Sequence, residues 1–217
     1  MPKLSPPARV ALEKFVIAAV VYAFIGFGYL IVNHAVEGRQ FHELWTPVDR
    51  AAPFWQGFIW AYYLVFVTPL SILLFVDRIE HIRRAGLALV MNVLVAFPVF
   101  VLYPVTMPRP AAEQLVWNVS GYATDFIWQL DKPINCFPSI HVSLAVTAGF
   151  IVSRFHRSAG LVVHFCALAI SVSTIFVKQH FLLDVVSGFL LGAGSYWLAF
   201  VKDVAAPLPF FQASAAS

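Results

Sequence analysis

The feature of this sequence that most constrains its fold is a series of six long apolar runs separated by short polar linkers. The hydrocarbon core of a bilayer is about 30 Å thick, so a helix needs about 20 mainly apolar residues to cross it. The six runs are 15–33, 56–76, 86–105, 138–153, 159–177 and 182–201. Inside lipid, only helices and closed barrels satisfy their own backbone hydrogen bonds. The sequence therefore predicts an all-α, polytopic membrane protein: one domain over residues 1–217, built as a bundle of six transmembrane helices.

The composition agrees with lipid as the main solvent of the chain. Hydrophobic residues make up 60% of it and charged residues only 12%, whereas soluble domains carry about 25% charged residues. The formal net charge of +3 is spread over short linkers. It therefore favours a role in membrane topology over nucleic-acid binding. Two cysteines, Cys136 and Cys166, are too few for a disulfide framework.

The distribution of lysine and arginine predicts how the bundle is oriented. With six crossings, both termini lie on one side, and that side carries nine basic residues: Lys3, Arg9, Lys14, Arg78, Arg83, Arg84, Arg154, Arg157 and Lys202. The other side carries five: Arg39, Arg50, Arg109, Lys132 and Lys178. Positive residues are enriched in cytoplasmic loops. We therefore expect cytoplasmic termini, and we expect the second side to be extracytoplasmic, either periplasmic or lumenal.

Two short polar islands interrupt the apolar sequence where the fourth and sixth spans are predicted to begin. The first island is Cys136-Phe137-Pro138-Ser139-Ile140-His141, and the second is Lys178-Gln179-His180-Phe181-Leu182-Leu183-Asp184. An ionisable group at the centre of a membrane helix costs about 2.5–3.5 kcal/mol on the insertion scale. A cluster of such groups at the predicted extracytoplasmic surface therefore indicates a functional site.

The second island contains a histidine and an aspartate with helical spacing. His180 and Asp184 are four residues apart, so on a helix they share a face. A carboxylate that accepts from one imidazole nitrogen fixes the tautomer and leaves a lone pair on the other nitrogen. It also stabilises the charge that develops when the ring acts as a nucleophile. Such a pair alone is more often a structural hydrogen bond, but its place at the mouth of a span, two residues after Lys178, favours catalysis.

The first island has the composition of a helix start that binds anions. Ser139 is a good N-cap residue, and the free amides of a helix N-terminus bind phosphate oxygens. His141, one turn further on, could donate a proton to a leaving alkoxide. Taken alone, this stretch is better explained as a capped helix with a hydrogen-bonded histidine. The convergence of both islands with Arg109, which prolines flank on either side, favours an active site.

The order and spacing of these groups resemble a known family. Arg109-Pro110, Pro138-Ser139-Ile140-His141 and His180-x3-Asp184 resemble the motifs of the type 2 phosphatidic acid phosphatase superfamily of membrane lipid phosphatases and phosphotransferases. That family reads Lys-x6-Arg-Pro, Pro-Ser-Gly-His and Ser-Arg-x5-His-x3-Asp, on a six-helix core whose site faces outward. The resemblance implies that His180 is the nucleophile, Asp184 its orienting partner and His141 the acid for the leaving group. It also implies phosphate binding by Arg109, Ser139 and the amide of Ile140.

The chain departs from the family pattern at three positions. Leu102 stands where the family has lysine, Ile140 where it has glycine, and Thr174 where it has arginine. Lys178 is the first candidate to supply the missing positive charge at the phosphate, and Lys132 is the alternative. The Phe-Pro-Ser-Ile-His and Lys-Gln-His forms resemble the branch that includes inositol phosphorylceramide synthase-like proteins.

The function that the resemblance implies is that of an integral-membrane lipid phosphatase. It would hydrolyse a lipid phosphomonoester or pyrophosphate through a phosphohistidine; the alternative is a lipid phosphotransferase that moves a phospho-headgroup to a lipid alcohol through the same intermediate. We expect no cofactor and no metal ion, because basic residues would stabilise the phosphate charge. The expected partners are a lipid phosphate and membrane lipids, with no nucleic acid. The lipid, the choice between hydrolysis and transfer, and the oligomeric state stay open. A transporter or structural bundle is disfavoured because no polar path crosses the predicted spans.

The sixth predicted span contains a glycine motif. Gly188 and Gly192 are four residues apart and give a Gly-x-x-x-Gly spacing. Small residues at this spacing let helix backbones approach closely in membranes. The motif predicts close helix packing, either within the bundle or between subunits.

Overall fold

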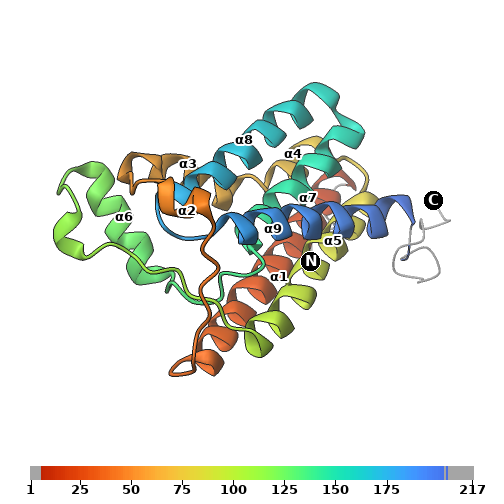
Figure 1. Cartoon of the computed structure of the whole chain (residues 1–217). Coiled ribbons are helices and arrows are strands. Elements are labelled where there is room, and N and C mark those ends of the chain that lie inside the picture. The colour runs from red at the N-terminus through yellow and green to blue at the C-terminus, as the bar shows by residue number, and fades with distance from the viewer. Residues whose placement is uncertain (1–5, 203, 205–217) are drawn as a thin grey trace, which may run out of the picture.

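A computed structural model describes residues 6–202 and 204, and in this part of the chain all regular structure is helical (Figure 1). The helices are α1 (Pro6–Val36), α2 (Pro47–Ala51), α3 (Ile59–Val67), α4 (Ser71–Phe75), α5 (Ile79–Leu102), α6 (Val119–Leu130), α7 (Ile140–Phe155), α8 (Arg157–Phe176) and α9 (Leu182–Tyr196). Two 3₁₀ turns (Gln56–Phe58 and Ala112–Gln114) and a π-helical turn (Trp197–Val201) complete the set. Residues 1–5 and 205–217, expected in the cytoplasm, lie outside the described residues.

Four of the described helices are long and apolar enough to cross a membrane. They cover Ala8–Val36, Ile79–Leu102, Arg157–Phe176 and Leu182–Val201. Two shorter apolar helices, Gln56–Val67 and Ile140–Phe155, lie in the segments predicted as the second and fourth spans. The predicted helical class of membrane protein is therefore confirmed, and helices occupy all six of the predicted segments.

The run 56–76, predicted as a single span, is divided in the structure. Helix α3 ends at Val67 and α4 begins at Ser71, with a turn over residues 68–70. Pro69 lies inside this turn, and proline has no N–H to continue the helical ladder. The Thr68 carbonyl closes the turn, because it accepts from both the amide (3.1 Å) and the hydroxyl (2.6 Å) of Ser71. The expectation of a continuous second helix is therefore wrong.

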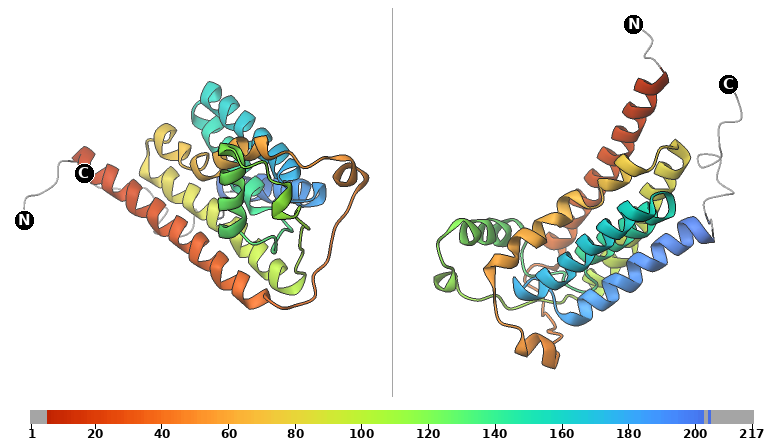
Figure 2. Two further views of the ribbon diagram at one scale, coloured as in Figure 1. Left: turned by 90° about the vertical axis from the view of Figure 1, so that its left-hand side faces the viewer. Right: turned by 90° about the horizontal axis from the view of Figure 1, so that it is seen from above.

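Helix α7 lies at the centre of the bundle. It packs against α8, α9, α5, α3 and α4, while α1 runs beside α5 on the outside (Figures 1 and 2). The approach of α9 to α7 depends on the glycine motif. A Cβ atom added at Gly188 would lie 2.6 Å from the Ser139 carbonyl oxygen, and one added at Gly192 would lie 2.5 Å from the Ser143 carbonyl oxygen. The predicted close packing is confirmed, and it occurs within the bundle.

Three linkers, over residues 37–46, 103–118 and 131–139, and the α8–α9 turn meet at one end of the bundle. They share a small apolar core of Val105, Met107, Cys136 and Phe181, with Leu44, Trp45 and Phe137 packed against it. Backbone hydrogen bonds also join the linkers, because His42 donates to the Pro104 carbonyl and accepts from the Thr106 amide. This ordered end holds the two polar islands next to each other.

Candidate active site

Two histidines face each other where α7 and α9 begin. His141 lies in the first turn of α7, and His180 comes two residues before α9. Nδ1 of His141 is 2.9 Å from Nε2 of His180. On the other side of the His180 ring, Nδ1 is 3.4 Å from Oδ2 of Asp184, which also accepts from the Phe181 amide at 2.8 Å. The same carboxylate oxygen of Asp184 therefore caps α9 and orients the His180 ring.

These contacts determine which His180 nitrogen is available as a nucleophile. A carboxylate only accepts hydrogen bonds, so Nδ1 of His180 carries the hydrogen that faces Asp184. Nε2 of the neutral ring then has a lone pair, and it points at His141. The side chain of His180 is 5% exposed, so this lone pair is shielded from bulk water and is accessible only from within the site.

The second nitrogen of His141 contacts a second set of polar side chains, Tyr62 and Asp131. Its Nε2 is 3.0 Å from the Tyr62 hydroxyl and 3.7 Å from Oδ2 of Asp131. The Tyr62 hydroxyl is also 3.1 Å from the same Asp131 oxygen, and Tyr29 donates to Oδ1 of Asp131. A continuous polar chain thus connects Asp184, through both histidines, to Asp131.

Arg109 approaches the histidines from the linker between α5 and α6. Its guanidinium donates to the carbonyls of Trp128 and Asp131 and to Oε1 of Gln179, and it lies over the Trp128 ring at 5.6 Å. Burial lowers the pKa of Arg109 and the Asp131 carboxylate opposes this shift, but arginine stays protonated in proteins. Nε of Arg109, Nε2 of Gln179 and Nε1 of Trp128 are buried and have no hydrogen-bond partner in the described structure. The site therefore offers donors that an anionic ligand can use.

Ser139 caps α7 and fastens it to α9. Its Oγ accepts from the Val142 amide at 3.3 Å, and its own amide donates to the Asp184 carbonyl at 3.0 Å. Because Oγ accepts from the backbone, its hydroxyl hydrogen is free to donate to a ligand. Ile140 is the first residue of α7, where backbone amides have no acceptor within the helix. Both groups can donate to a phosphate oxygen next to His141.

Lys178 lies in the turn between α8 and α9 but points away from the histidines. Its backbone is left-handed, with φ of 57°. Its ammonium donates to the Ala52 carbonyl at 2.7 Å and to the Asp49 carbonyl at 3.4 Å. Burial lowers the pKa of Lys178, and the Asp49 carboxylate opposes this shift. Lys178 therefore anchors the turn that carries His180 to the end of α2.

Lys132, the alternative to Lys178, lies on the surface. It pairs with Glu37 near the end of α1, and this partner lowers the pKa of the Glu37 carboxyl. Within the described residues, no hydrogen bond or ion pair joins Lys132 or Lys178 to Arg109 or to either histidine. The structure thus brings together Arg109, Ser139, Ile140, His141, His180 and Asp184 from the predicted set, and it leaves both lysines at the edge.

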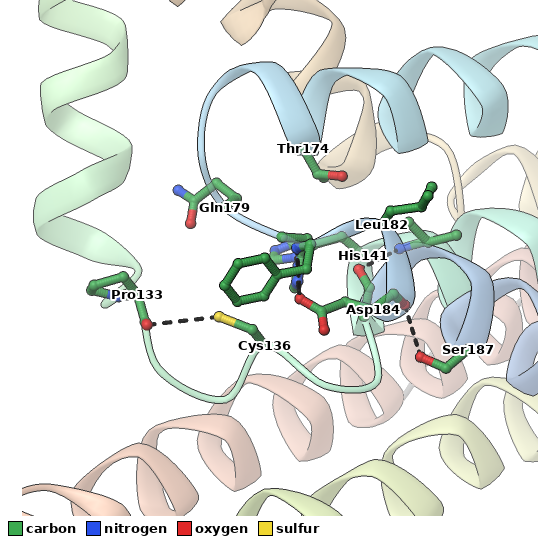
Figure 3. A network of polar contacts seen from close by, with 12 residues as sticks. Pro133, Cys136, His141, Thr174, Gln179, Leu182, Asp184 and Ser187 are labelled. Atoms are coloured by element: carbon green, nitrogen blue, oxygen red, sulfur yellow. Dashed lines mark hydrogen bonds and ion pairs between the residues drawn. The ribbon is translucent and has the colours of Figure 1, made fainter. Parts of the chain in front are cut away.

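One group of side chains has the spacing of a metal site. The Cys136 thiol, His180 and Asp184 offer ligand atoms within 4.8 Å of one another (Figure 3 shows Cys136 beside Asp184). Burial, followed by the charges of Asp184 and Asp131, raises the pKa of the Cys136 thiol well above its ordinary value. Both ring nitrogens of His180 already have partners, since Nδ1 faces Asp184 at 3.4 Å and Nε2 faces His141 at 2.9 Å, so a metal ion would have to displace one of them. The donor set fits a metal poorly.

Two adjoining apolar cavities open beside His141. They measure about 470 Å³ and about 220 Å³. Both are lined by Tyr22, Gly26, Tyr29, Phe66 and His141, so they meet between α1, α3 and α7. An apolar space of this size, with His141 at one end, suits a ligand that has a long hydrocarbon part and a polar head.

A family model described as the PAP2 superfamily matches residues 36–198, which is most of the 217-residue chain. The chain belongs to the PAP2 superfamily. The resemblance read from the sequence motifs is therefore confirmed. The matched range contains both histidines, Arg109 and Asp184, so the polar chain lies inside the part that defines membership.

Two further comparisons agree with this membership. The chain is 38% identical over 69 residues to the bacitracin transport permease protein BcrC of Bacillus licheniformis, a match that covers 30% of this chain and 34% of that relative. The chain thus spans about a third of the length of this curated relative. The crystal structure of Aquifex aeolicus LpxE superposes with a TM-score of 0.52 at 20% identity, covering 80% of this chain and 94% of LpxE. This second likeness shows a shared fold.

The PAP2 motifs did not reveal every polar residue of the site. Asp131, Tyr62 and Gln179 contact the motif residues, and Asp49 accepts from the Leu182 amide at 2.8 Å, which fixes the start of α9. In the sequence, Tyr62 is only a tyrosine within an apolar run, and Asp131 is only an aspartate directly before Lys132. Neither signal indicates a contact with His141, because the partners lie far apart in the sequence.

Proposed function

We propose that the chain is an integral-membrane lipid phosphate phosphatase that works through a phosphohistidine at His180. The observation that carries the proposal is the hydrogen-bonded chain Asp184–His180–His141 at the edge of an apolar cavity of about 470 Å³. The histidine pair suits phosphoryl transfer, and the cavity suits a hydrocarbon chain. Membership of the PAP2 superfamily supports both parts.

The proposed reaction has two steps. Nε2 of His180 attacks phosphorus and the phosphorus–oxygen bond to the lipid breaks, while His141 gives the proton on Nδ1 to the leaving oxygen. Water then attacks the phosphohistidine, gives a proton to His141 and releases inorganic phosphate. Nδ1 of His141 lies 2.9 Å from Nε2 of His180, in the place that a phosphorus atom bonded to Nε2 would occupy. Substrate binding therefore has to open the contact between the two rings.

The phosphate oxygens would be held by groups on the linker between α5 and α6 and at the start of α7. Arg109 supplies a positive charge and the free donor Nε, Ser139 its hydroxyl and Ile140 its amide. Preorganised donors of this kind stabilise the charge of the transferring phosphoryl group. Lys178 adds positive charge nearby, but its ammonium has to leave the Ala52 carbonyl to contact the phosphate directly. We propose that no metal ion is required.

The proposed topology is a single domain that crosses the membrane six times. The four long apolar helices and the two shorter ones fit this number, and the excess of positive residues on the side of the termini supports a cytoplasmic location there. The site then faces the extracytoplasmic side. With Cys136 and Cys166 replaced, an impermeant thiol reagent on intact cells should label a Glu113→Cys variant and spare Arg157→Cys. The opposite labelling would reverse the orientation.

The experiment that tests the function is phosphate release by detergent-purified protein. The panel comprises a glycerolipid phosphomonoester, an isoprenyl phosphate and an isoprenyl pyrophosphate, each assayed with a chelator present and with a His180→Ala variant alongside. We expect release that survives the chelator and is lost in the variant. Release that is equal in the variant would refute the role of His180. Consumption of the substrate only when a lipid alcohol is added, with the phosphate recovered as a new lipid phosphomonoester and not as inorganic phosphate, would establish the transferase alternative.

A further inference from the structure

His141 has a carboxylate partner that the family motifs do not contain. Asp131 comes from the linker between α6 and α7, and its Oδ2 lies 3.7 Å from Nε2 of His141. On His180, Oδ2 of Asp184 is within hydrogen-bond distance of Nδ1 at 3.4 Å, whereas Asp131 reaches His141 through the Tyr62 hydroxyl as well as by this longer contact. Each histidine of the pair therefore turns one nitrogen toward the other ring and one toward a carboxylate.

The Asp131 carboxylate is fixed by two tyrosines from different helices. Tyr29 of α1 donates to Oδ1, and the Tyr62 hydroxyl of α3 lies 3.1 Å from Oδ2 and 3.0 Å from Nε2 of His141. The other charged groups that face His141 are His180 at Nδ1 and Arg109, which donates to the Asp131 backbone carbonyl. Placing a carboxylate beside an apolar cavity costs free energy, which the two hydroxyl partners offset. Such a placement indicates that the position of the carboxylate has a function.

The position of Asp131 determines which nitrogen of His141 exchanges protons. The Tyr62 hydroxyl donates to Oδ2 of Asp131 at 3.1 Å, so its oxygen, 3.0 Å from Nε2 of His141, is left to accept from Nε2–H and keeps the hydrogen of the ring on that atom. When His141 is doubly protonated, Nδ1–H is the proton that faces the phosphoryl site and passes to the leaving oxygen. The ring that remains has its hydrogen on Nε2 and a lone pair on Nδ1. That lone pair is then directed at the water that attacks the phosphohistidine.

We propose that Asp131, held by Tyr29 and Tyr62, is the positioning carboxylate of His141 and fixes it as acid in the first step and base in the second. The inference rests on the proposed function and deepens it. In the first step the proton on Nδ1 goes to the lipid oxygen as its bond to phosphorus breaks. In the second step a proton of water goes to Nδ1 as the bond between phosphorus and His180 breaks. The net reaction is ester plus water to alcohol plus phosphate.

The same residue connects the acid to the phosphate site. The Asp131 backbone carbonyl accepts from the Arg109 guanidinium, while its side chain faces His141. A replacement that changes only the side chain, Asp131→Asn, leaves the carbonyl contact to Arg109 in place. The carboxylate also acts on the charge of Arg109, so the effect is assigned by comparing leaving groups: a change in phosphate binding affects all substrates equally, whereas a change in His141 affects those that need a proton.

The test compares two substrates that share a hydrocarbon chain and differ in their leaving group. An alkyl phosphate needs a proton on its leaving alkoxide, whereas a nitrophenyl phosphate leaves as a stable phenolate and needs none. The ratio kcat/KM reports the steps up to departure of the leaving group. We expect Asp131→Asn to lower kcat/KM about 10²-fold on the alkyl phosphate, within the range of acid–base catalysis, and about threefold or less on the aryl phosphate.

Control variants separate this role from folding. Asp125→Asn, on the half-exposed side of α6, should leave both substrates at wild-type values, and Tyr29→Phe should give the Asp131→Asn pattern at smaller size. Equal losses on both substrates, or no loss on the alkyl phosphate, would overturn the role of Asp131. If Asp131→Asn does not fold, Tyr29→Phe decides by the same criterion. A wild-type protein that releases phosphate from neither substrate would instead remove the proposed function, and this inference with it.

Discussion

The close contact between α7 and α9 makes Gly188→Ala a sharp test of how the site is assembled. The added Cβ would lie 2.6 Å from the Ser139 carbonyl oxygen, whereas close carbon–oxygen contacts begin at about 3.3 Å. The contact is therefore about 0.7 Å too short. Because the clashing atom belongs to the backbone, the two helices have to separate by that amount near His141 and His180. Overpacking of this kind costs about 1–3 kcal/mol. A misplacement of about 1 Å at an active site costs about 10²-fold in rate.

We therefore expect Gly188→Ala to lower kcat by about 10-fold or more, because its displacement approaches the 1 Å case, and to lower the melting temperature. The assay is phosphate release together with thermal unfolding in the same detergent. Gly194→Ala is the matched control on the same helix, because no atom lies within 4 Å of its added Cβ. Wild-type activity and stability of Gly188→Ala would show that α7 and α9 do not position the two histidines as described.

Two further variants test the surroundings of the histidines. Arg109→Lys keeps the charge but loses the planar fork that contacts Gln179, so kcat/KM should fall by about tenfold or more; wild-type kinetics would contradict a directional role. Lys178→Met removes the hydrogen bond to the Ala52 carbonyl, so activity and melting temperature should fall. They should fall less in Lys132→Met, because that variant loses only an exposed ion pair with Glu37, and such pairs contribute about 0–1 kcal/mol. Burial lowers the pKa of Lys178 in the folded state, so between that lowered value and the ordinary value of about 10.4 the unfolded chain binds the proton more tightly. The free energy of unfolding should rise with pH across that interval; an unchanged pH dependence of thermal unfolding in Lys178→Met would contradict the burial of this ammonium.

Local sequence patterns predicted those parts of the structure that depend on near neighbours. The pairing of His180 with Asp184 follows from their spacing of four residues, and the cap at Ser139 follows from its place before an apolar helix. The break between α3 and α4 was not predicted, although its cause is also local, because Pro69 stands inside the apolar run. These features are set by backbone geometry over one or two turns.

The contacts around His141 could not be predicted in the same way. Tyr62 and Asp131 are separated by 69 residues, and Tyr62 and His141 by 79, so their meeting depends on how α3 and the α6–α7 linker pack. The direction of Lys178 is also a tertiary property. Its left-handed backbone and the carbonyls of a separate linker turn the ammonium away from the site that its charge suggested.

The central claim is that a phosphoryl group is transferred to Nε2 of His180. It is tested most directly by rapid mixing of the purified protein with a lipid substrate that carries a radiolabelled phosphate, followed by quenching in alkali, which preserves phosphohistidine. The account predicts protein-bound label that forms before phosphate is released, maps to the peptide containing His180 and is absent from His180→Ala. Rapid phosphate release with no labelled protein, or label that persists in His180→Ala, would contradict it.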